Sequence, residues 1–211
     1  MNVAGILRDR MIFNMTEEEW DRVLKVHLYG TFNCTKFATV LMRQQRSGRI
    51  INTSSSSGLG SPGQPNYGAA KEGIVGLTRS VARAVGKYGV TCNAIRPGGA
   101  TRMTLSPEVL AALEKRKTGE FVAGPAGAET LEIEAMRPED VGPFVAWLAS
   151  DDAWNVNGYD FEIHSGVVGV YSQPTIIRSV HKVGPWTVDD MFQLCPLITK
   201  DLPNPAPPQP K

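Results

Sequence analysis

Hydrophobic residues recur with helical spacing over residues 16–45. Thr16 at the expected N-cap and Glu19 three residues later form a capping box, in which each side chain satisfies a backbone N–H of the other residue. Apolar residues follow on more than one face of this helix: Trp20, Val23, Leu24, Leu28, Phe32, Phe37, Val40 and Leu41. A helix with two apolar sides is buried on both, so we expect contacts with a sheet and with a partner.

Short apolar runs bounded by glycine, proline or serine predict buried strands, and longer periodic segments between them predict helices. The expected strands are a strand end at residues 1–7 and the runs 49–53, 89–95 and 159–163, with 167–171 as a candidate extension of the last. The expected helices are 64–87, a mostly helical segment 105–136, 138–150, and a weaker amphipathic helix at 187–199. This alternation predicts an α/β fold with a doubly wound parallel sheet, Rossmann-like, whose chemistry lies beyond the carboxyl ends of the strands.

Composition narrows the possible partners. The 22 basic and 21 acidic residues are interspersed and leave a net charge of +1, so neither a nucleic acid nor a membrane is expected as a partner. Cys34, Cys92 and Cys195 form no C-x-x-C motif, which argues against a disulfide framework or a metal site and favours the reducing cytoplasm. The N-terminus carries charges where a secretory signal needs an apolar stretch, and no run approaches the ~20 apolar residues of a membrane span.

Tyr67 and Lys71 are the most informative pair of residues. On a helix, positions i and i+4 share a face, so the phenol and the ammonium point into one space. A nearby cation favours the phenolate, and we therefore expect a lowered Tyr67 pKa and proton exchange with an alcohol or a ketone. Such pairs also occur on ordinary surface helices, so the pair gains its meaning from its surroundings.

The surrounding motifs resemble those of the short-chain dehydrogenase/reductase family over residues 1–166. They are Asn2-x-Ala4-Gly5, a serine cluster before the tyrosine helix, Tyr67-x-x-x-Lys71, Asn93-x-x-x-Pro97-Gly98 with Thr101, and Arg137 to Val141 followed by Leu148-Ala149-Ser150. Each motif is weak alone, but their order and spacing are together specific.

The resemblance implies NAD or NADP as the cofactor and assigns roles to particular residues. Tyr67 would be the acid/base, and Lys71 would hold the nicotinamide ribose and tune the tyrosine. A serine would bind the substrate oxygen. Pro97, Gly98 and Thr101 would line the nicotinamide side.

The asparagine motif at the start of the chain would add Asn2 and Gly5 to the cofactor-binding residues.

Two serines compete for the substrate-binding role. The family's usual spacing from the tyrosine gives Ser54, whereas alignment on the end of the preceding strand gives Ser55 with one loop residue deleted. A strand register is harder to shift than a loop length, because a slip of one residue turns every side chain over. We therefore assign Ser55.

His27 occupies a place where the family usually has an asparagine that supports a water-linked proton relay. A helical kink there would let His27 take part in that relay, and a structural histidine is the equal alternative.

Residues 58–63 formally read G-x-G-x-x-G, but the next strand ends in Ile95-Arg96-Pro97 without the acidic residue that a dinucleotide fingerprint requires. We interpret this loop as the link between the serine and the tyrosine.

The family's glycine-rich phosphate loop normally precedes the Asn-x-Ala-Gly motif, which here starts at residue 2. We therefore expect residues 1–172 to be the C-terminal portion of such a domain, followed by an extension at 173–202 with a weak helix and a disordered proline-rich tail at 203–211. The 211-residue chain is expected to bind dinucleotides poorly, because the pyrophosphate cradle and its helix N-terminus are absent. It is expected to be marginally stable, because one edge of its sheet would be exposed.

The resulting functional expectation is an NAD(P)-dependent oxidoreductase that interconverts a secondary alcohol and a ketone. The resemblance points to a 3-oxoacyl or 3-hydroxyacyl thioester or a steroid-like ketone as the small-molecule substrate, and to a homodimer or homotetramer assembled through the helices at 16–45 and 64–87. The alternative is a non-catalytic fragment or assembly subunit of such an enzyme.

Overall fold

The computed structural model describes residues 1–101, 104–105, 110 and 136–206. Most of the segment expected to be helical at 105–136, and residues 207–211 of the expected tail, lie outside the described residues. The chain divides into two compact units, Met1–Tyr171 and Ser172–Lys211.

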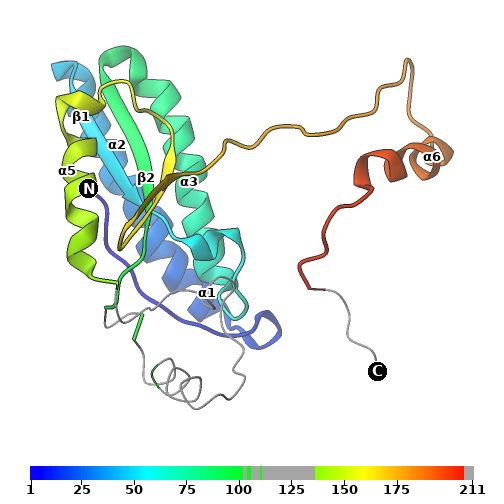
Figure 1. The fold of residues 1–211 in the computed structure, drawn as a ribbon, viewed down its shortest axis with the longest axis horizontal. Helices are drawn as coiled ribbons and strands as arrows, with labels where there is room; N and C mark the ends of the chain where they lie inside the picture. The colour runs from blue at the N-terminus through cyan, green and yellow to red at the C-terminus, as the bar shows by residue number, and fades with distance from the viewer. Residues whose placement is uncertain (102–103, 106–109, 111–135, 207–211) are drawn as a thin grey trace. The chain divides into compact units, whose positions relative to one another are not determined.

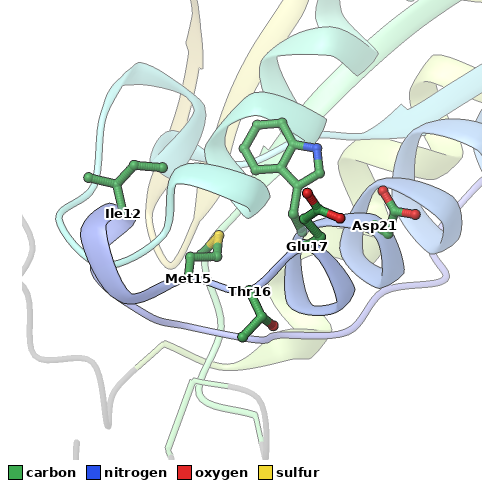
Figure 2. Close-up of a pocket in the computed structure, with 6 residues that line it drawn as sticks. Ile12, Met15, Thr16, Glu17 and Asp21 are labelled. Carbon is green, nitrogen blue, oxygen red and sulfur yellow. The ribbon is translucent and has the colours of Figure 1, made fainter.

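The long N-terminal helix begins and ends as expected but consists of three parts. They are α1 (Glu17–Leu24), a π-helical turn (Lys25–Tyr29) and α2 (Gly30–Gln45). The capping box is present, since the Thr16 hydroxyl accepts from Glu19 N at 3.2 Å and the Glu19 carboxylate accepts from Thr16 N at 2.9 Å. A surface hollow lies beside this first turn (Figure 2).

Within the described residues, four strands form the sheet, in the order β1 (Gly48–Thr53), β2 (Val90–Pro97), β3 (Asp160–His164) and β4 (Val167–Val170). The first three are parallel, with Ile51 opposite Asn93 and Ile95 opposite Phe161. Asn2 pairs in parallel with Asn52 on the other side of β1, as an isolated bridge in place of the expected strand end.

The expectation for residues 167–171 was wrong. These residues do not extend the preceding strand, because the chain reverses and β4 pairs antiparallel with β3. The reversal passes through Gly166, whose φ of +71° is a conformation that glycine adopts without steric cost. The sheet is therefore mixed, with one antiparallel strand added to a parallel Rossmann-like sheet.

Helices cover both faces of this sheet, as in a doubly wound fold (Figure 1). The connection from β1 to β2 is α3 (Pro65–Val85), which a short 3-10 turn extends (Gly86–Tyr88). On the other face lies α5 (Gly142–Ala149), which begins after a 3-10 turn (Pro138–Val141).

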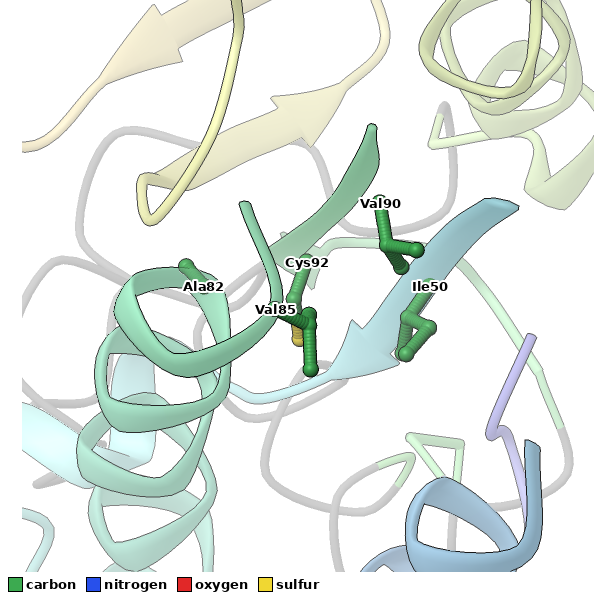
Figure 3. Close-up of a cluster of buried hydrophobic side chains, with 5 residues drawn as sticks. All are labelled: Ile50, Ala82, Val85, Val90 and Cys92. Carbon is green, nitrogen blue, oxygen red and sulfur yellow. The ribbon is translucent and has the colours of Figure 1, made fainter. Parts of the chain in front are cut away.

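Neighbouring residues of β1 separate the two halves of the core. Ile50 faces α3 and packs in a cluster with Ala82, Val85, Val90 and Cys92 (Figure 3). Ile51 faces the opposite way and packs with residues that include Leu148 of α5 and Phe161 of β3. Successive strand side chains point to opposite faces, so the apolar run of β1 supplies both layers and fixes the carboxyl end of the strand in space.

The second unit contains α6 (Val188–Thr199), close to the expected helix. Its first turn is closed by a capping box, in which the Asp190 carboxylate accepts from Thr187 N at 2.7 Å. A hydrogen bond from Lys182 is the main reason that the pKa of Asp190 falls to about 2. In the part of the chain that the structure describes, no helix combines the length and apolar character needed to cross a bilayer.

Candidate active site

The first two turns of α3 carry the tyrosine and the lysine beside the ends of β1 and β2. Pro65 occupies the first helical position, where its missing N–H is not needed. The buried Asn66 follows, and its amide donates to Arg8 O at 2.9 Å and to Glu19 O at 3.1 Å. Its side-chain oxygen accepts from Tyr67 N at 2.7 Å, so Asn66 ties the start of α3 to α1 and to the N-terminal segment.

Sequence reasoning missed this role of Asn66. The only local signal is a polar residue directly before the tyrosine, at a helix start where backbone N–H groups need partners. Its two carbonyl acceptors lie far away in sequence and are visible only in the folded chain.

Lys71 is buried, with 4% of its surface exposed. Its ammonium donates to Thr53 O, the last residue of β1, at 2.8 Å and lies 5.3 Å from the centre of the Tyr67 ring. Burial lowers its pKa from 10.5 to about 8, because a desolvated ammonium loses its hydration. The structure thus brings the two residues together, with the cation held at the end of the strand.

The Tyr67 pKa differs from the sequence-based expectation. It is raised, chiefly because burial disfavours the phenolate; a hydrogen bond with the Ser55 side chain acts in the opposite direction, and the Asp9 carboxylate raises it slightly further. The proximity of Lys71 does not decide the sign of the shift in the Tyr67 pKa, because burial dominates. In this structure Tyr67 is therefore a protonated phenol, able to donate.

The two candidate serines lie in different environments. Ser54 is buried, with its hydroxyl donating to Lys71 O at 2.9 Å and its N–H donating to Ile95 O at 2.7 Å. The Ser55 hydroxyl accepts from Ser57 N at 3.2 Å and interacts with the Tyr67 phenol. Ser54 thus joins the strand end to α3, whereas Ser55 faces the tyrosine.

His27 lies in the π-helical turn and is buried beside Tyr67, with ring centres 5.1 Å apart and edges meeting faces. Its Nε2 is 3.0 Å from Ile6 N and 2.8 Å from Ile6 O. Among the described residues its Nδ1 has no hydrogen-bond partner. Burial is the main cause that lowers its pKa, so His27 is neutral at physiological pH.

Gly5 makes room for this histidine. A Cβ atom at position 5 would lie 2.5 Å from His27 Cε1, well inside van der Waals contact. Asn2, the other residue assigned to the cofactor from this motif, directs its amide to Asn52 Oδ1 at 2.8 Å and Thr35 Oγ1 at 3.3 Å. The motif at the start of the chain therefore packs against α2, the π-helical turn and β1.

The remaining assigned residues lie at the end of β2 and in the loop beyond it. Pro97 is the last residue of β2, and Gly98 N donates to Ile163 O at 2.8 Å. A Cβ atom on Gly98 would lie 2.9 Å from His164 Cβ, so only glycine lets the chain pass β3 this closely. Thr101 N donates to Thr104 Oγ1 at 3.0 Å, in the loop beyond the strand.

The surface hollow near the N-terminus lies outside this cluster of assigned residues. The hollow at the start of α1 is lined by Ile12, Met15, Thr16, Glu17, Trp20 and Asp21, and it includes none of the assigned residues (Figure 2). Within the described ranges, no group of three or more histidine, cysteine, aspartate or glutamate side chains is arranged to hold a metal ion.

Comparison with known proteins gives consistent similarities. A family model described as enoyl-(acyl carrier protein) reductase matches residues 1–168. Over 187 residues, 84% of this chain and 55% of the relative, the chain is 42% identical to hydroxyacyl-CoA dehydrogenase ChsB1 of Mycobacterium tuberculosis. Over 171 residues, 79% of this chain and 64% of the relative, it is 40% identical to the 3-oxoacyl-[acyl-carrier-protein] reductase FabG of Staphylococcus aureus.

A solved structure of a short chain dehydrogenase from Mycobacterium avium matches the fold with a TM-score of 0.76 at 38% identity, covering 97% of this chain and 65% of that one. The chain thus spans between half and two thirds of the length of these relatives. The family model covers most of the chain, and the mixed sheet and the arrangement of its helices agree with the solved relative. The chain belongs to the short-chain dehydrogenase/reductase family.

Proposed function

We propose that the protein carrying this chain is an NAD(P)-dependent oxidoreductase that interconverts a secondary alcohol and a ketone. One observation carries the proposal: the Tyr67 phenol, the Lys71 ammonium and the Ser55 hydroxyl meet beside the carboxyl ends of the strands. For ketone reduction, Tyr67 donates its proton to the carbonyl oxygen as that oxygen gains negative charge. In the reverse direction the phenolate takes the hydroxyl proton of the alcohol.

Ser55 and Lys71 support this proton transfer in different ways. The Ser55 hydroxyl donates to the substrate oxygen and holds it near the phenol. The Lys71 charge, desolvated and fixed at Thr53 O, stabilises the phenolate that forms when the proton leaves. Such a preorganised charge costs little reorganisation at the moment of reaction.

The residues present fit the nicotinamide half of NAD or NADP, which supplies the hydride acceptor or donor when bound. An ammonium has three N–H donors, and within the described chain the Lys71 ammonium gives one to Thr53 O, which leaves donors for ribose hydroxyls. Pro97 ends β2, and Gly98 and Thr101 follow it at the edge of the sheet where ligands of this fold bind. NAD and NADP share this half, so either dinucleotide satisfies these contacts.

Asn2 and Gly5 complete the proposed cofactor-binding set. They support the site by packing against the elements that surround it. Asn2 bridges β1 and α2, while Gly5 lies against His27. For His27, the buried Nδ1 supports a role in a proton relay behind Tyr67, and the two close approaches to Ile6 support a structural role.

We infer a 3-oxoacyl or 3-hydroxyacyl thioester as the substrate class. The similar proteins include a (3R)-3-hydroxyacyl-CoA dehydrogenase and a 3-oxoacyl-[acyl-carrier-protein] reductase, which differ in the carrier but share the 3-oxo or 3-hydroxy group. A steroid-like ketone is the second substrate class. The cytoplasm is the proposed location.

Self-association is supported by the outer face of α2. Phe32, Phe37, Val40 and Leu41 of α2 are exposed, and large apolar side chains gathered on one helix favour an interaction surface. We propose a homodimer or homotetramer that covers this face. The same surface favours the second candidate function, a non-catalytic assembly subunit, which would retain this contact without turnover.

Steady-state kinetics of Tyr67→Phe distinguishes these two functions when it is measured in a full-length protein that carries this chain together with a dinucleotide-binding segment. The variant keeps the ring against His27 but removes the transferable proton, so turnover of the thioester substrate should fall by ~10²-fold or more. Near-normal turnover would exclude Tyr67 as the acid/base. Wild-type protein without turnover on either thioester or on a steroid-like ketone would favour the assembly subunit.

Comparison of Ser55→Ala with Ser54→Ala tests the serine assignment. Ser55→Ala should reduce turnover while leaving the unfolding midpoint almost unchanged. Ser54→Ala should mainly lower stability, because its hydroxyl holds the strand end to Lys71 O. The opposite pattern would assign the substrate-binding role to Ser54.

A further inference from the structure

Arg96 is the largest of the fully buried side chains, with 1% of its surface exposed, and it lies on β2 directly before Pro97. A buried guanidinium is costly unless it is paired and hydrogen-bonded. Its Nε donates to the Asp160 carboxylate at 2.9 Å; its Nη2 lies 2.8 Å from the same carboxylate and donates to Glu72 at 2.9 Å. Its remaining nitrogen, Nη1, donates to Ser55 O at 2.7 Å.

These acceptors connect three separate elements to one guanidinium. Asp160 begins β3, Glu72 follows Lys71 on α3, and Ser55 follows β1. Arg79 also donates to Asp160, at 3.2 Å, so two cations are balanced by two carboxylates. The Ser55 carbonyl is the one acceptor of Arg96 that belongs to a residue of the proposed catalytic group.

The loop that follows Ser55 is packed closely against this network. A Cβ atom on Gly58 would lie 2.9 Å from the Glu72 carboxylate and 3.1 Å from Arg96 Nη1. Gly58 N donates to the same Ser55 carbonyl at 3.0 Å. The Tyr171 ring covers the guanidinium, with its centre 4.7 Å from Arg96 Cζ. The Ser55 main chain is thus fixed from both sides.

We propose that Arg96 is a positioning residue, which acts through the Ser55 carbonyl to hold the Ser55 hydroxyl against Tyr67. The inference rests on the proposed function in assigning Ser55 and Tyr67 to the reaction. The peptide plane after Ser55 determines the direction of its backbone, and Arg96 and Gly58 both bond the carbonyl of that plane. Lysine at position 96 would keep the charge but lose the planar fork that serves several acceptors at once.

The first test follows the Tyr67 phenol by NMR, with tyrosines labelled at the ring carbon that bears oxygen and the Tyr67 signal assigned from Tyr67→Phe. The Ser55 side chain opposes the effect of burial on the Tyr67 pKa. Ser55→Ala and Arg96→Lys should therefore both raise the titration midpoint of Tyr67. In the Ser55→Ala background, Arg96→Lys should raise it no further, because the route through the serine is already lost.

Arg79→Lys is the matched control, since Arg79 shares the Asp160 carboxylate but donates to no group of the serine loop in the described contacts. It should leave the Tyr67 midpoint unchanged. Gly58→Ala is the second variant, because it displaces the loop from Arg96 by a few tenths of an ångström without removing any charge. It should reproduce the effect of Arg96→Lys even if that variant folds poorly.

Turnover provides the second readout. A misplaced catalytic group costs up to ~10²-fold in rate, so Arg96→Lys should lower kcat by about that factor with a smaller change in KM. An unchanged Tyr67 midpoint in Arg96→Lys and Gly58→Ala, or a full additional shift in the Ser55→Ala background, would overturn the role of Arg96. Normal turnover in Tyr67→Phe would instead overturn the proposed function, and the two failures are therefore distinguishable.

Discussion

Replacement of Lys71 by methionine should stabilise the fold near neutral pH while abolishing turnover. The Lys71 ammonium is buried at the end of β1, and burial lowers its pKa from 10.5 to about 8. At ~1.4 kcal/mol per pKa unit, this fall means that the charged Lys71 side chain lowers the free energy of unfolding by ~3 kcal/mol at pH 7. Methionine has a similar length and no charge, so Lys71→Met removes that cost together with the bond to Thr53 O.

The pH dependence of stability separates the desolvation cost of the Lys71 charge from the effect of losing its hydrogen bond to Thr53 O. Between pH 8 and 10.5 the unfolded chain holds the Lys71 proton and the folded chain has released it, so stability rises with pH over this interval and is flat below it. The free energy of unfolding of wild type relative to Lys71→Met should therefore increase by ~3 kcal/mol between pH 7 and pH 10.5. Other titrating groups are common to both proteins and cancel in the difference.

Urea unfolding at 25 °C, repeated at several values from pH 7 to pH 10.5, measures this difference. Lys87→Met is the matched control for the exchange of a lysine for a methionine, because Lys87 is exposed. A flat difference for Lys71→Met, or one that falls as pH rises, would refute the claim that Lys71 is held as a desolvated cation.

Three further predictions concern the supports of the site. Burial lowers the pKa of His27 below 6.5, so the free energy of unfolding should decline as the pH falls below that value. Urea midpoints at pH 7 and pH 5 should show a smaller decline for His27→Gln than for wild type, and equal declines would contradict this. Gly5→Ala should lower stability by ~1–3 kcal/mol in thermal melts, through contact with His27, and much less in a His27→Ala background. Asn66→Asp turns a carboxylate toward Arg8 O and Glu19 O and should cost at least ~2 kcal/mol in denaturant unfolding, whereas an unchanged midpoint would show that these bonds are dispensable.

Local pattern was sufficient for several elements of the fold. The capping box at Thr16, the apolar run of β1 and the periodic segment of α3 each depend on residues within a few positions of one another. The i,i+4 spacing likewise placed Tyr67 and Lys71 on one face, because helix geometry alone fixes that relation. The sequence by itself thus determined the α/β class, the family resemblance and the pair at the centre of the site.

Tertiary structure decided what depends on residues far apart in the chain. The direction of β4 depends on the turn at Gly166 and on its pairing with β3. The Tyr67 pKa is raised because surrounding segments exclude water, which spacing along a helix does not reveal.

The partners of the polar side chains were also outside the reach of local pattern. Ser54 bonds Lys71 O, whereas Ser55 faces Tyr67, and the two serines differ only in which way a strand end presents them. No local pattern distinguished Arg96, yet its guanidinium donates to acceptors on three elements. Periodicity reports which face of an element is apolar, but burial and long-range hydrogen bonds exist only once the elements have packed.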